Sequence, residues 1–229
     1  MRAFFDFVRS IMFWSVFFFA ALFIALSYPA IKFFAPKNEK IFQNMMKFFL
    51  RIAFRISFID ISMIGAENIP KNKGFVIAAN HSSFIDSLAL IAWLPISFKI
   101  VAARAGFKLP LMGRVFAGAG YIPTGLSMNF DEQAGLYKAL KNKDNVLIYS
   151  KLPKESEIGR FTEAMVAAAK EAGVPILPIC IKGSTKVMPM KKFILREGKI
   201  SIRIGEPIFL LDLKSVQGEM ERLYQMQVF

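Results

Sequence analysis

The sequence predicts an α/β protein, a mixed sheet flanked by helices, preceded by an N-terminal helix that is transmembrane or membrane-embedded. Short runs rich in β-branched residues alternate with helical patterns beyond Asp60, which is typical of a layered α/β fold. A long uncharged stretch near the start predicts the membrane helix. We therefore divide the chain into a membrane anchor (1–34), a basic amphipathic helix (38–59) and an α/β domain (60–229).

Composition favours a membrane as the partner of this chain. Its 229 residues carry a formal charge of +13, yet 55% are hydrophobic and 25 are Phe. Positive charge suits nucleic acid or an anionic membrane surface, and the sequence has no zinc-ligand spacing, basic repeat or RNA-binding aromatic signature. We therefore expect no nucleic-acid partner. The single cysteine, Cys180, excludes an intrachain disulfide and, within an apolar run, is predicted to be a buried structural thiol.

The apolar stretch Ile11–Ile31 contains no charged residue. At about 1.5 Å per residue, a helix of this length crosses a hydrocarbon core roughly 30 Å thick. A cleaved signal peptide is the competing interpretation, but the stretch is longer than the usual apolar region and no small-x-small cleavage site follows it. We expect a retained anchor in the cytoplasmic (inner) membrane, the α/β domain on the cytoplasmic side, and a folded remainder after deletion of 1–34.

The stretch Ile41–Asp60 has the pattern of an amphipathic helix. Apolar residues recur at helical spacing, namely Ile41, Met45, Phe48, Phe49, Ile52 and Ile56. A second face carries Lys47, Arg51 and Arg55, four residues apart. Such a helix can lie in the headgroup layer of a membrane, or it can pack its apolar face on the protein's own core. Both interpretations remain open at this point.

The domain beyond Asp60 divides into strands and helices. Candidate strands are 59–64, 75–79, 99–102, 120–123, 146–149, 175–181 and 199–204. Candidate helices begin near Asp86, Glu132, Arg160 and Leu213. Gly173 is predicted to cap the third of these helices, and Pro175 to open a buried strand.

His81 is the only histidine in the chain, so base chemistry that uses imidazole at neutral pH must use this residue. Asp86 follows five positions later, which on a regular helix would place the two side chains about 140° apart. They meet only if His81 ends a strand and Asp86 lies in the first turn of a helix. Ser82 and Ser83 suit such a junction. The alternative is a capping Asp beside an incidental His.

The run NHSSFID resembles the His-x4-Asp block of the glycerol-3-phosphate and lysophosphatidate acyltransferase family. The resemblance extends, in order, over IGAENIPKNKGFVIAANHSSFIDSLAL, FKLPLMG, AGVPILPICIKG and IRIGEPI, roughly residues 60–210. It implies a membrane-bound O-acyltransferase in which His81 is the general base and Asp86 orients it. It further implies acyl carrier protein or coenzyme A as the acyl carrier, a lysolipid acceptor, most commonly 1-acylglycerol-3-phosphate, and no cofactor or metal.

Two blocks depart from the family pattern, and both concern the acceptor's phosphate. The second block lacks its usual Arg after Tyr121 and Ile122, and the third has Lys151 and Lys154 where the family has Glu and Arg. The cations that could replace a phosphate-binding Arg are Lys108, Lys151, Lys154 and Arg160. Three alternatives stay open: another acceptor, such as a lyso-aminolipid; a lipid-binding protein that has lost catalysis; and a hydrolase with Ser82 or Ser83 as nucleophile. The hydrolase lacks a Gly-x-Ser-x-Gly elbow.

Overall fold

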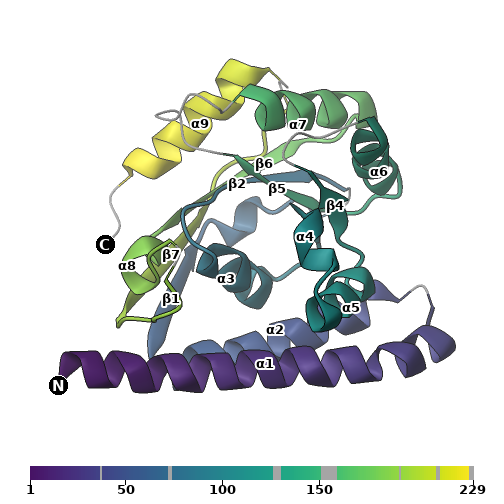
Figure 1. The fold of residues 1–229 in the computed structure, drawn as a ribbon. Coiled ribbons are helices and arrows are strands. Elements are labelled where there is room, and N and C mark those ends of the chain that lie inside the picture. The colour runs from purple at the N-terminus through teal and green to yellow at the C-terminus, as the bar shows by residue number, and fades with distance from the viewer. Residues whose placement is uncertain are drawn as a thin grey trace.

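A mixed sheet forms the centre of the computed structural model, which describes residues 1–36, 38–71, 74–125, 130–150, 159–190, 192–209 and 212–226. Within these residues seven strands share one sheet in the order β1-β7-β6-β2-β5-β3-β4 (Figure 1). Their bounds are β1 (Ile59–Ile64), β2 (Val76–Asn80), β3 (Lys99–Ala103), β4 (Ile122–Thr124), β5 (Val146–Ser150), β6 (Ile176–Lys182) and β7 (Gly198–Ile204). The predicted fold class is confirmed.

The direction of the strands determines at which edge of the sheet the residues that follow them lie. β6, β2, β5, β3 and β4 run parallel to one another, whereas β7 is antiparallel to β6 and carries β1 parallel to itself. The carboxyl ends of the five parallel strands therefore meet at one edge of the sheet. Asn80 is the last residue of β2 and pairs with Ser150, the last of β5.

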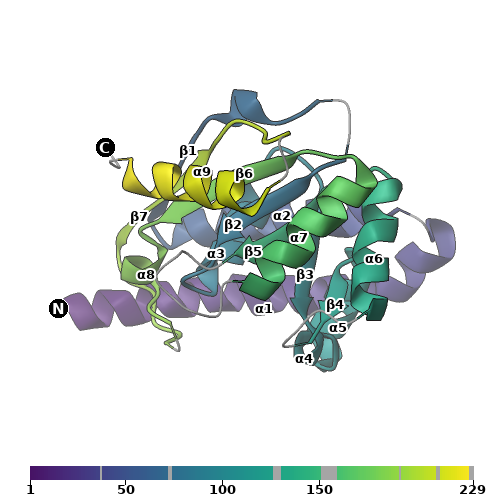
Figure 2. The same cartoon turned by 90° about the horizontal axis from the view of Figure 1, so that it is seen from above.

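Helices cover both faces of the sheet. α6 (Phe130–Lys141), α7 (Gly159–Ala172) and α9 (Leu213–Gln225) lie over one face, as Figure 2 shows from above. The other face carries α3 (Ile85–Trp93), with α1 (Arg2–Phe34) and α2 (Glu39–Ile56) beneath it. Short helices complete the chain: a 3-10 turn (Ala66–Asn68), α4 (Arg104–Phe107), α5 (Pro110–Gly118) and α8 (Ser184–Val187).

Burial on both faces explains the apolar strands. In β2, Val76 and Ala78 belong to the core under α6 and α7, and Ile77 and Ala79 to the core above α1 and α2. A strand enclosed in this way has no polar alternation, so it appears in the sequence as a short continuous apolar run. All seven predicted strands are present. β4 begins two residues later than predicted, because Gly120 (φ 72°) belongs to the turn after α5.

The longer helices of the α/β domain were predicted from the sequence, whereas the short ones were not. The four predicted starts agree with α3, α6, α7 and α9 to within two residues. Gly173 has the left-handed φ of 66° that a helix-ending glycine adopts, and Cys180 is 1% exposed, so both predictions are confirmed. The short helices α4, α5 and α8 were not predicted.

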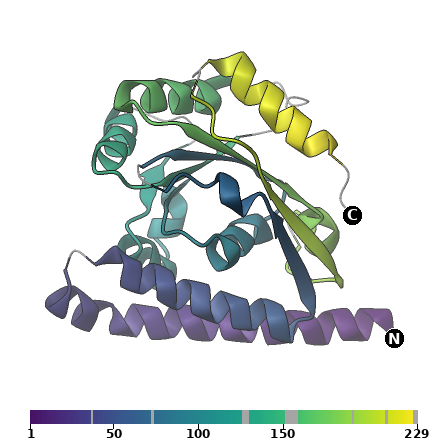
Figure 3. The same cartoon turned by 180° about the vertical axis from the view of Figure 1, so that it is seen from behind.

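α1 is both an apolar surface helix and part of the core. Among the described helices it is the one long and apolar enough to cross a membrane. Yet it lies lengthwise against α2 beneath the domain (Figures 1 and 3). Phe13 and Ile24 are buried in the same core as β2, and Arg9 Nε donates to the Ser57 carbonyl at 2.8 Å. This packing argues against the expectation that residues 1–34 can be removed without loss of the fold.

The two interpretations of α2 both describe part of its surface. One face packs on the protein's own core through Phe42, Met46, Leu50, Ala53 and Phe54. Of the apolar residues singled out from the sequence, Phe48 is 61% exposed, whereas Phe49 makes edge contacts with Phe19 and Phe23 of α1. α2 therefore joins α1 to the domain and keeps only a small exposed apolar area of its own.

The basic face of α2 is largely used inside the protein. Lys47 Nζ donates to the Leu94 carbonyl, and Arg51 Nε donates to the Ala92 carbonyl at 2.7 Å. Both carbonyls belong to the end of α3, whose unpaired carbonyls and partial negative charge favour cations. Burial, and then the charge of Arg51, lowers the pKa of Lys47. Arg55 remains exposed.

Phe13 and Phe18 separate the two roles of α1, since Phe13 is fully buried and Phe18 is 58% exposed. We expect Phe13→Ala to lower the free energy of unfolding by about 3–5 kcal/mol, because it leaves a cavity in the core. Phe18→Ala should change it by less than about 1 kcal/mol. Thermal or denaturant unfolding in detergent measures both. Equal stability of the two variants would show that α1 is only an anchor.

Candidate active site

His81 stands at the carboxyl edge of the parallel strands, directly after β2 and before α3. Its Nδ1 lies 3.4 Å from Oδ2 of Asp86, which is in the first turn of α3. The Asp86 side chain is fully buried, whereas that of His81 is 35% exposed. The structure therefore brings the two predicted residues together, with one ring edge toward a carboxylate and about a third of the His81 side chain exposed.

The Asp86 carboxylate also shapes the turn that carries His81. Its Oδ2 accepts hydrogen bonds from the backbone N–H groups of Ser82 and Ser83, both at 2.8 Å. These donors precede the helix, where N–H groups lack helical partners and the dipole favours negative charge. The turn thus draws residue 86 back toward residue 81, which a continuous helix would not allow.

Tyr149 fixes the plane of the imidazole. The two rings stack with centroids 4.1 Å apart and an interplanar angle of 25°. Tyr149 is on β5, paired with Ala79, and its hydroxyl donates to Ser87 Oγ at 2.8 Å. Burial raises the pKa of Tyr149 above its ordinary value, so the hydroxyl stays protonated and keeps this bond. The sequence showed an aromatic residue near the end of a strand. It did not show the pairing of β5 with β2 that places this residue beside His81.

Neither neighbouring serine is arranged as a nucleophile. Ser83 is buried, and its hydroxyl donates to the Met188 carbonyl at 2.6 Å. Ser82 Oγ lies 3.4 Å from Ser184 Oγ at the start of α8. A serine nucleophile needs its hydroxyl within hydrogen-bond reach of the base. Both hydroxyls instead contact the segment that follows β6.

Few of the proposed phosphate-binding cations can be placed. Lys151 and Lys154 lie outside the described residues, and Arg160 is in the first turn of α7, where only the backbone is described. Lys108 is exposed directly after α4. The cationic site predicted from the family's third block is therefore not tested by the structure.

Strand register adds one cation that the sequence analysis did not select. Ile100 of β3 pairs with Leu147 of β5, and Asn80 of β2 pairs with Ser150. His81 directly follows β2 and Arg104 directly follows β3, so both lie at the carboxyl edge of the sheet, on opposite sides of β5. β2 and β3 are two strand spacings, roughly 10 Å, apart. An Arg directly after an apolar strand was the only sequence signal for this position.

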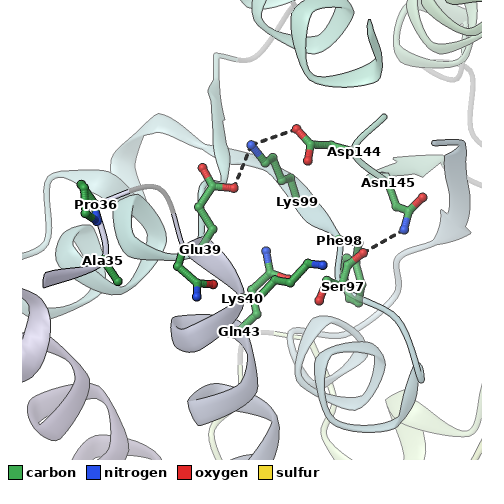
Figure 4. A pocket seen from close by; sticks show the side chains of 11 residues that line it. Ala35, Pro36, Glu39, Lys40, Gln43, Ser97, Phe98, Lys99, Asp144 and Asn145 are labelled. Carbon is green, nitrogen blue, oxygen red and sulfur yellow. Dashed lines mark hydrogen bonds and ion pairs between the residues drawn. The ribbon is translucent and has the colours of Figure 1, made fainter. Parts of the chain in front are cut away.

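A hollow lies at the opposite edge of the sheet from His81 (Figure 4). It has a volume of about 670 Å³ and lies where β3 and β5 begin, between Lys99, Asp144 and the start of α2. Lys99 Nζ contacts Glu39 at 2.9 Å and Asp144 at 3.1 Å. Burial alone would lower the pKa of Lys99, but its bonds to Glu39 and Asp144 outweigh burial and raise it. This hollow is far from the chain's single histidine, and its ion pairs join α2 to the sheet.

Comparisons with known proteins identify the family to which this chain is similar. A family model described as Acyltransferase matches residues 60–182. The chloroplastic 1-acyl-sn-glycerol-3-phosphate acyltransferase LPAT1 of Arabidopsis thaliana is 27% identical over 198 residues, which cover 83% of this chain and 55% of the plant protein. The 1-acyl-sn-glycerol-3-phosphate acyltransferase of Bacillus subtilis is 25% identical over 168 residues, covering 72% of this chain and 82% of the bacterial protein.

A solved structure confirms the fold along the whole chain. The crystal structure of the 1-acyl-sn-glycerophosphate acyltransferase PlsC from Thermotoga maritima superposes with a TM-score of 0.79 at 20% identity, covering 100% of both chains. The chain spans about half the length of the plant and algal relatives it matches. The matched family segment nevertheless occupies more than half of this sequence and contains both His81 and Asp86. The chain belongs to the Acyltransferase family.

Proposed function

We propose that this protein transfers an acyl group from a thioester donor to the free hydroxyl of a lysolipid. The observation that supports this most directly is the geometry of His81, which is oriented by a buried carboxylate on one edge and a stacked Tyr149 on its face. The acceptor we propose is 1-acylglycerol-3-phosphate, which would give phosphatidate. The acyl carrier is coenzyme A or acyl carrier protein.

In this proposal His81 acts as a general base. With Nδ1–H directed at Asp86, the lone pair of Nε2 takes the proton of the acceptor hydroxyl as its oxygen attacks the thioester carbonyl. The new ester C–O bond forms, the C–S bond breaks, and the imidazolium returns the proton to the leaving thiolate. Such proton transfer contributes about 10²–10⁴ in rate. The reaction needs no metal ion or cofactor beyond the donor.

Membrane association is supported by α1, and its packing indicates how the helix would lie. A lone spanning helix has lipid-facing surface on all sides, whereas α1 buries one face of its middle part, residues 10–25, on α2 and the domain. The exposed face carries Phe4, Ile11, Phe18, Leu22 and Leu26. We therefore propose that α1 lies along the membrane surface, with this face in one leaflet. The cytoplasmic side of the inner membrane stays a prediction.

The first test removes the base. We expect His81→Ala to lower acyl transfer at least a hundredfold, because proton removal from the acceptor is lost, while vesicle association is unchanged. Ser82→Ala is the matched control beside it and should keep activity within a few-fold. The measurement is steady-state transfer on membranes with lysophosphatidate and both thioester donors. Transfer by His81→Ala within tenfold of the parent would contradict the assignment.

The second test removes the charge of Asp86 but keeps its shape. Asp86→Asn should reduce the rate at least tenfold, since an amide orients the imidazole poorly and does not stabilise the imidazolium. Asp212→Asn is the control, because Asp212 also caps a helix by accepting from Ser215 N at 2.8 Å. The rate and the unfolding temperature are measured for both. If Asp86→Asn loses only stability, as the control should, Asp86 is a cap and nothing more.

The third test concerns the acceptor's phosphate. Arg104 stands at the same edge of the sheet as His81 and two strands away, so we propose Arg104 as the cation that binds the phosphate while the hydroxyl faces the base. Arg104→Ala should lower the ratio of rates on lysophosphatidate and on a phosphate-free lysolipid by roughly ten- to a hundredfold. Arg114→Ala, an exposed Arg on α5, should leave the ratio unchanged. An unchanged ratio in Arg104→Ala would place the phosphate elsewhere.

A further inference from the structure

A loop beside the candidate site exposes large apolar side chains. It connects α8 to β7, and we call its described residues, 188–190 and 192–195, the 188–195 segment. Phe193 is 70% exposed, Met190 53% and Ile194 52%. One exposed apolar side chain on a soluble surface is ordinary, but three within five residues form a patch that calls for a partner.

This segment is attached to α1. The Trp14 indole Nε1 donates to the Phe193 carbonyl at 2.7 Å, and the two rings lie 5.7 Å apart. Four residues earlier on the same helix face, Ser10 Oγ accepts from Leu195 N at 2.8 Å. The carboxyl-terminal half of the segment is thus held against the helix that we propose lies in the membrane.

The position of the segment around α1 shows which surface it extends. At 3.6 residues per turn, Ser10 and Trp14 lie about 180° from Phe19 and Phe23, which contact α2. The exposed face of α1, which includes Phe18, lies between these two flanks. The 188–195 segment therefore borders the exposed face on the side opposite to α2, so its apolar patch is continuous with that face.

Charge around the segment indicates which membrane it suits. Residues 183–196 contain four basic residues, Lys186, Lys191, Lys192 and Arg196, and no acidic residue. Aromatic and aliphatic side chains beside flanking cations match a surface with an apolar interior and anionic headgroups. We propose that the 188–195 segment is a second membrane-contact element, which inserts Met190, Phe193 and Ile194 into an anionic lipid bilayer beside α1. This inference rests on the proposed membrane location of α1.

The same segment reaches the catalytic turn. Ser83 Oγ donates to the Met188 carbonyl, and Phe84 of that turn lies 6.2 Å from the Trp14 ring. Insertion of the segment would therefore hold the turn that carries His81 at a fixed height above the acyl region. α1 alone would let the domain roll about the helix axis, whereas a second membrane contact beside α1 would prevent this.

The chain offers a clean labelling experiment, since its single cysteine is 1% exposed and burial raises the pKa of Cys180 to about 11. Buried, protonated thiols react slowly. We would label Phe193→Cys with the environment-sensitive fluorophore nitrobenzoxadiazole. Phe18→Cys is the reference on α1, and Phe209→Cys, 76% exposed in the segment between β7 and α9, is the matched control. The probe is a vesicle of phosphatidylcholine and phosphatidylglycerol, with and without brominated acyl chains.

We expect labels at 18 and 193 to brighten, shift to shorter wavelength and be quenched by brominated chains, whereas the label at 209 should not respond. A response at 18 without one at 193 would overturn this inference and leave the membrane location of α1 intact. No response at either position would overturn both. Because the readout is fluorescence, neither result depends on the acyltransferase assignment.

A measurement of vesicle binding tests the same inference without a fluorescent label. Phe193→Asp combined with Ile194→Asp should weaken partition into these vesicles on the order of tenfold, since burial of two apolar side chains is replaced by charge. Phe209→Asp should leave partition unchanged. Partition of the double variant equal to that of the parent would overturn the inference.

Discussion

The buried carboxylate of Asp86 is the interaction on which the candidate site depends. A charged group with no exposed surface needs partners, and Asp86 has the N–H groups of Ser82 and Ser83, the amino end of α3 and the imidazole of His81. From sequence, a capping Asp and a functional Asp appeared as alternatives. In the structure Oδ2 of Asp86 has both roles. Its hydrogen bonds to the backbone before α3 shape the turn that brings His81 to the carboxylate.

The rest of the fold supports this turn from both ends of α3. Asn80, just before His81, joins β2 to β6 through its side-chain amide, with bonds of 2.8 and 2.6 Å to the backbone of Ile181. At the far end of α3, Lys47 and Arg51 of α2 occupy the terminal carbonyls. α3 thus has a carboxylate at its positive end and two cations at its negative end, as the helix dipole favours. The site and the helix pair beneath the domain are linked through one short helix.

Sequence reasoning succeeded where the signal is local. The strands were found because burial on both faces leaves short apolar runs, and His81 with Asp86 because a lone His before a capping turn is visible in seven letters. Tyr149 and Arg104 were missed because their place depends on register between strands far apart in the chain. The burial of one face of α1 in the protein core could not be predicted from the sequence, because a membrane and a protein interior both favour apolar residues. The internal role of Lys47 was hidden because a lysine that binds the carbonyls at a helix end cannot be told from a membrane-facing lysine by sequence alone.

The proposed position of α1, with one face in the protein core and the other in the membrane, has a consequence for how the proposed acceptor would reach His81. Phe84, within the catalytic turn, is 45% exposed and lies within 6.5 Å of both Trp14 and Phe17 of α1. If the outer face of α1 lies about 5 Å deep among the acyl chains, this turn, about one helix diameter or roughly 10 Å further out, stands about 5 Å above the hydrocarbon core. That is within the layer of the glycerol backbone and headgroup, which is roughly 5–7 Å thick on each side of a core of about 30 Å. A lysolipid could then present its hydroxyl to Nε2 while its chain stays in the membrane, so the free energy of extracting that chain, about 0.8 kcal/mol per CH₂ group, need not enter the reaction barrier.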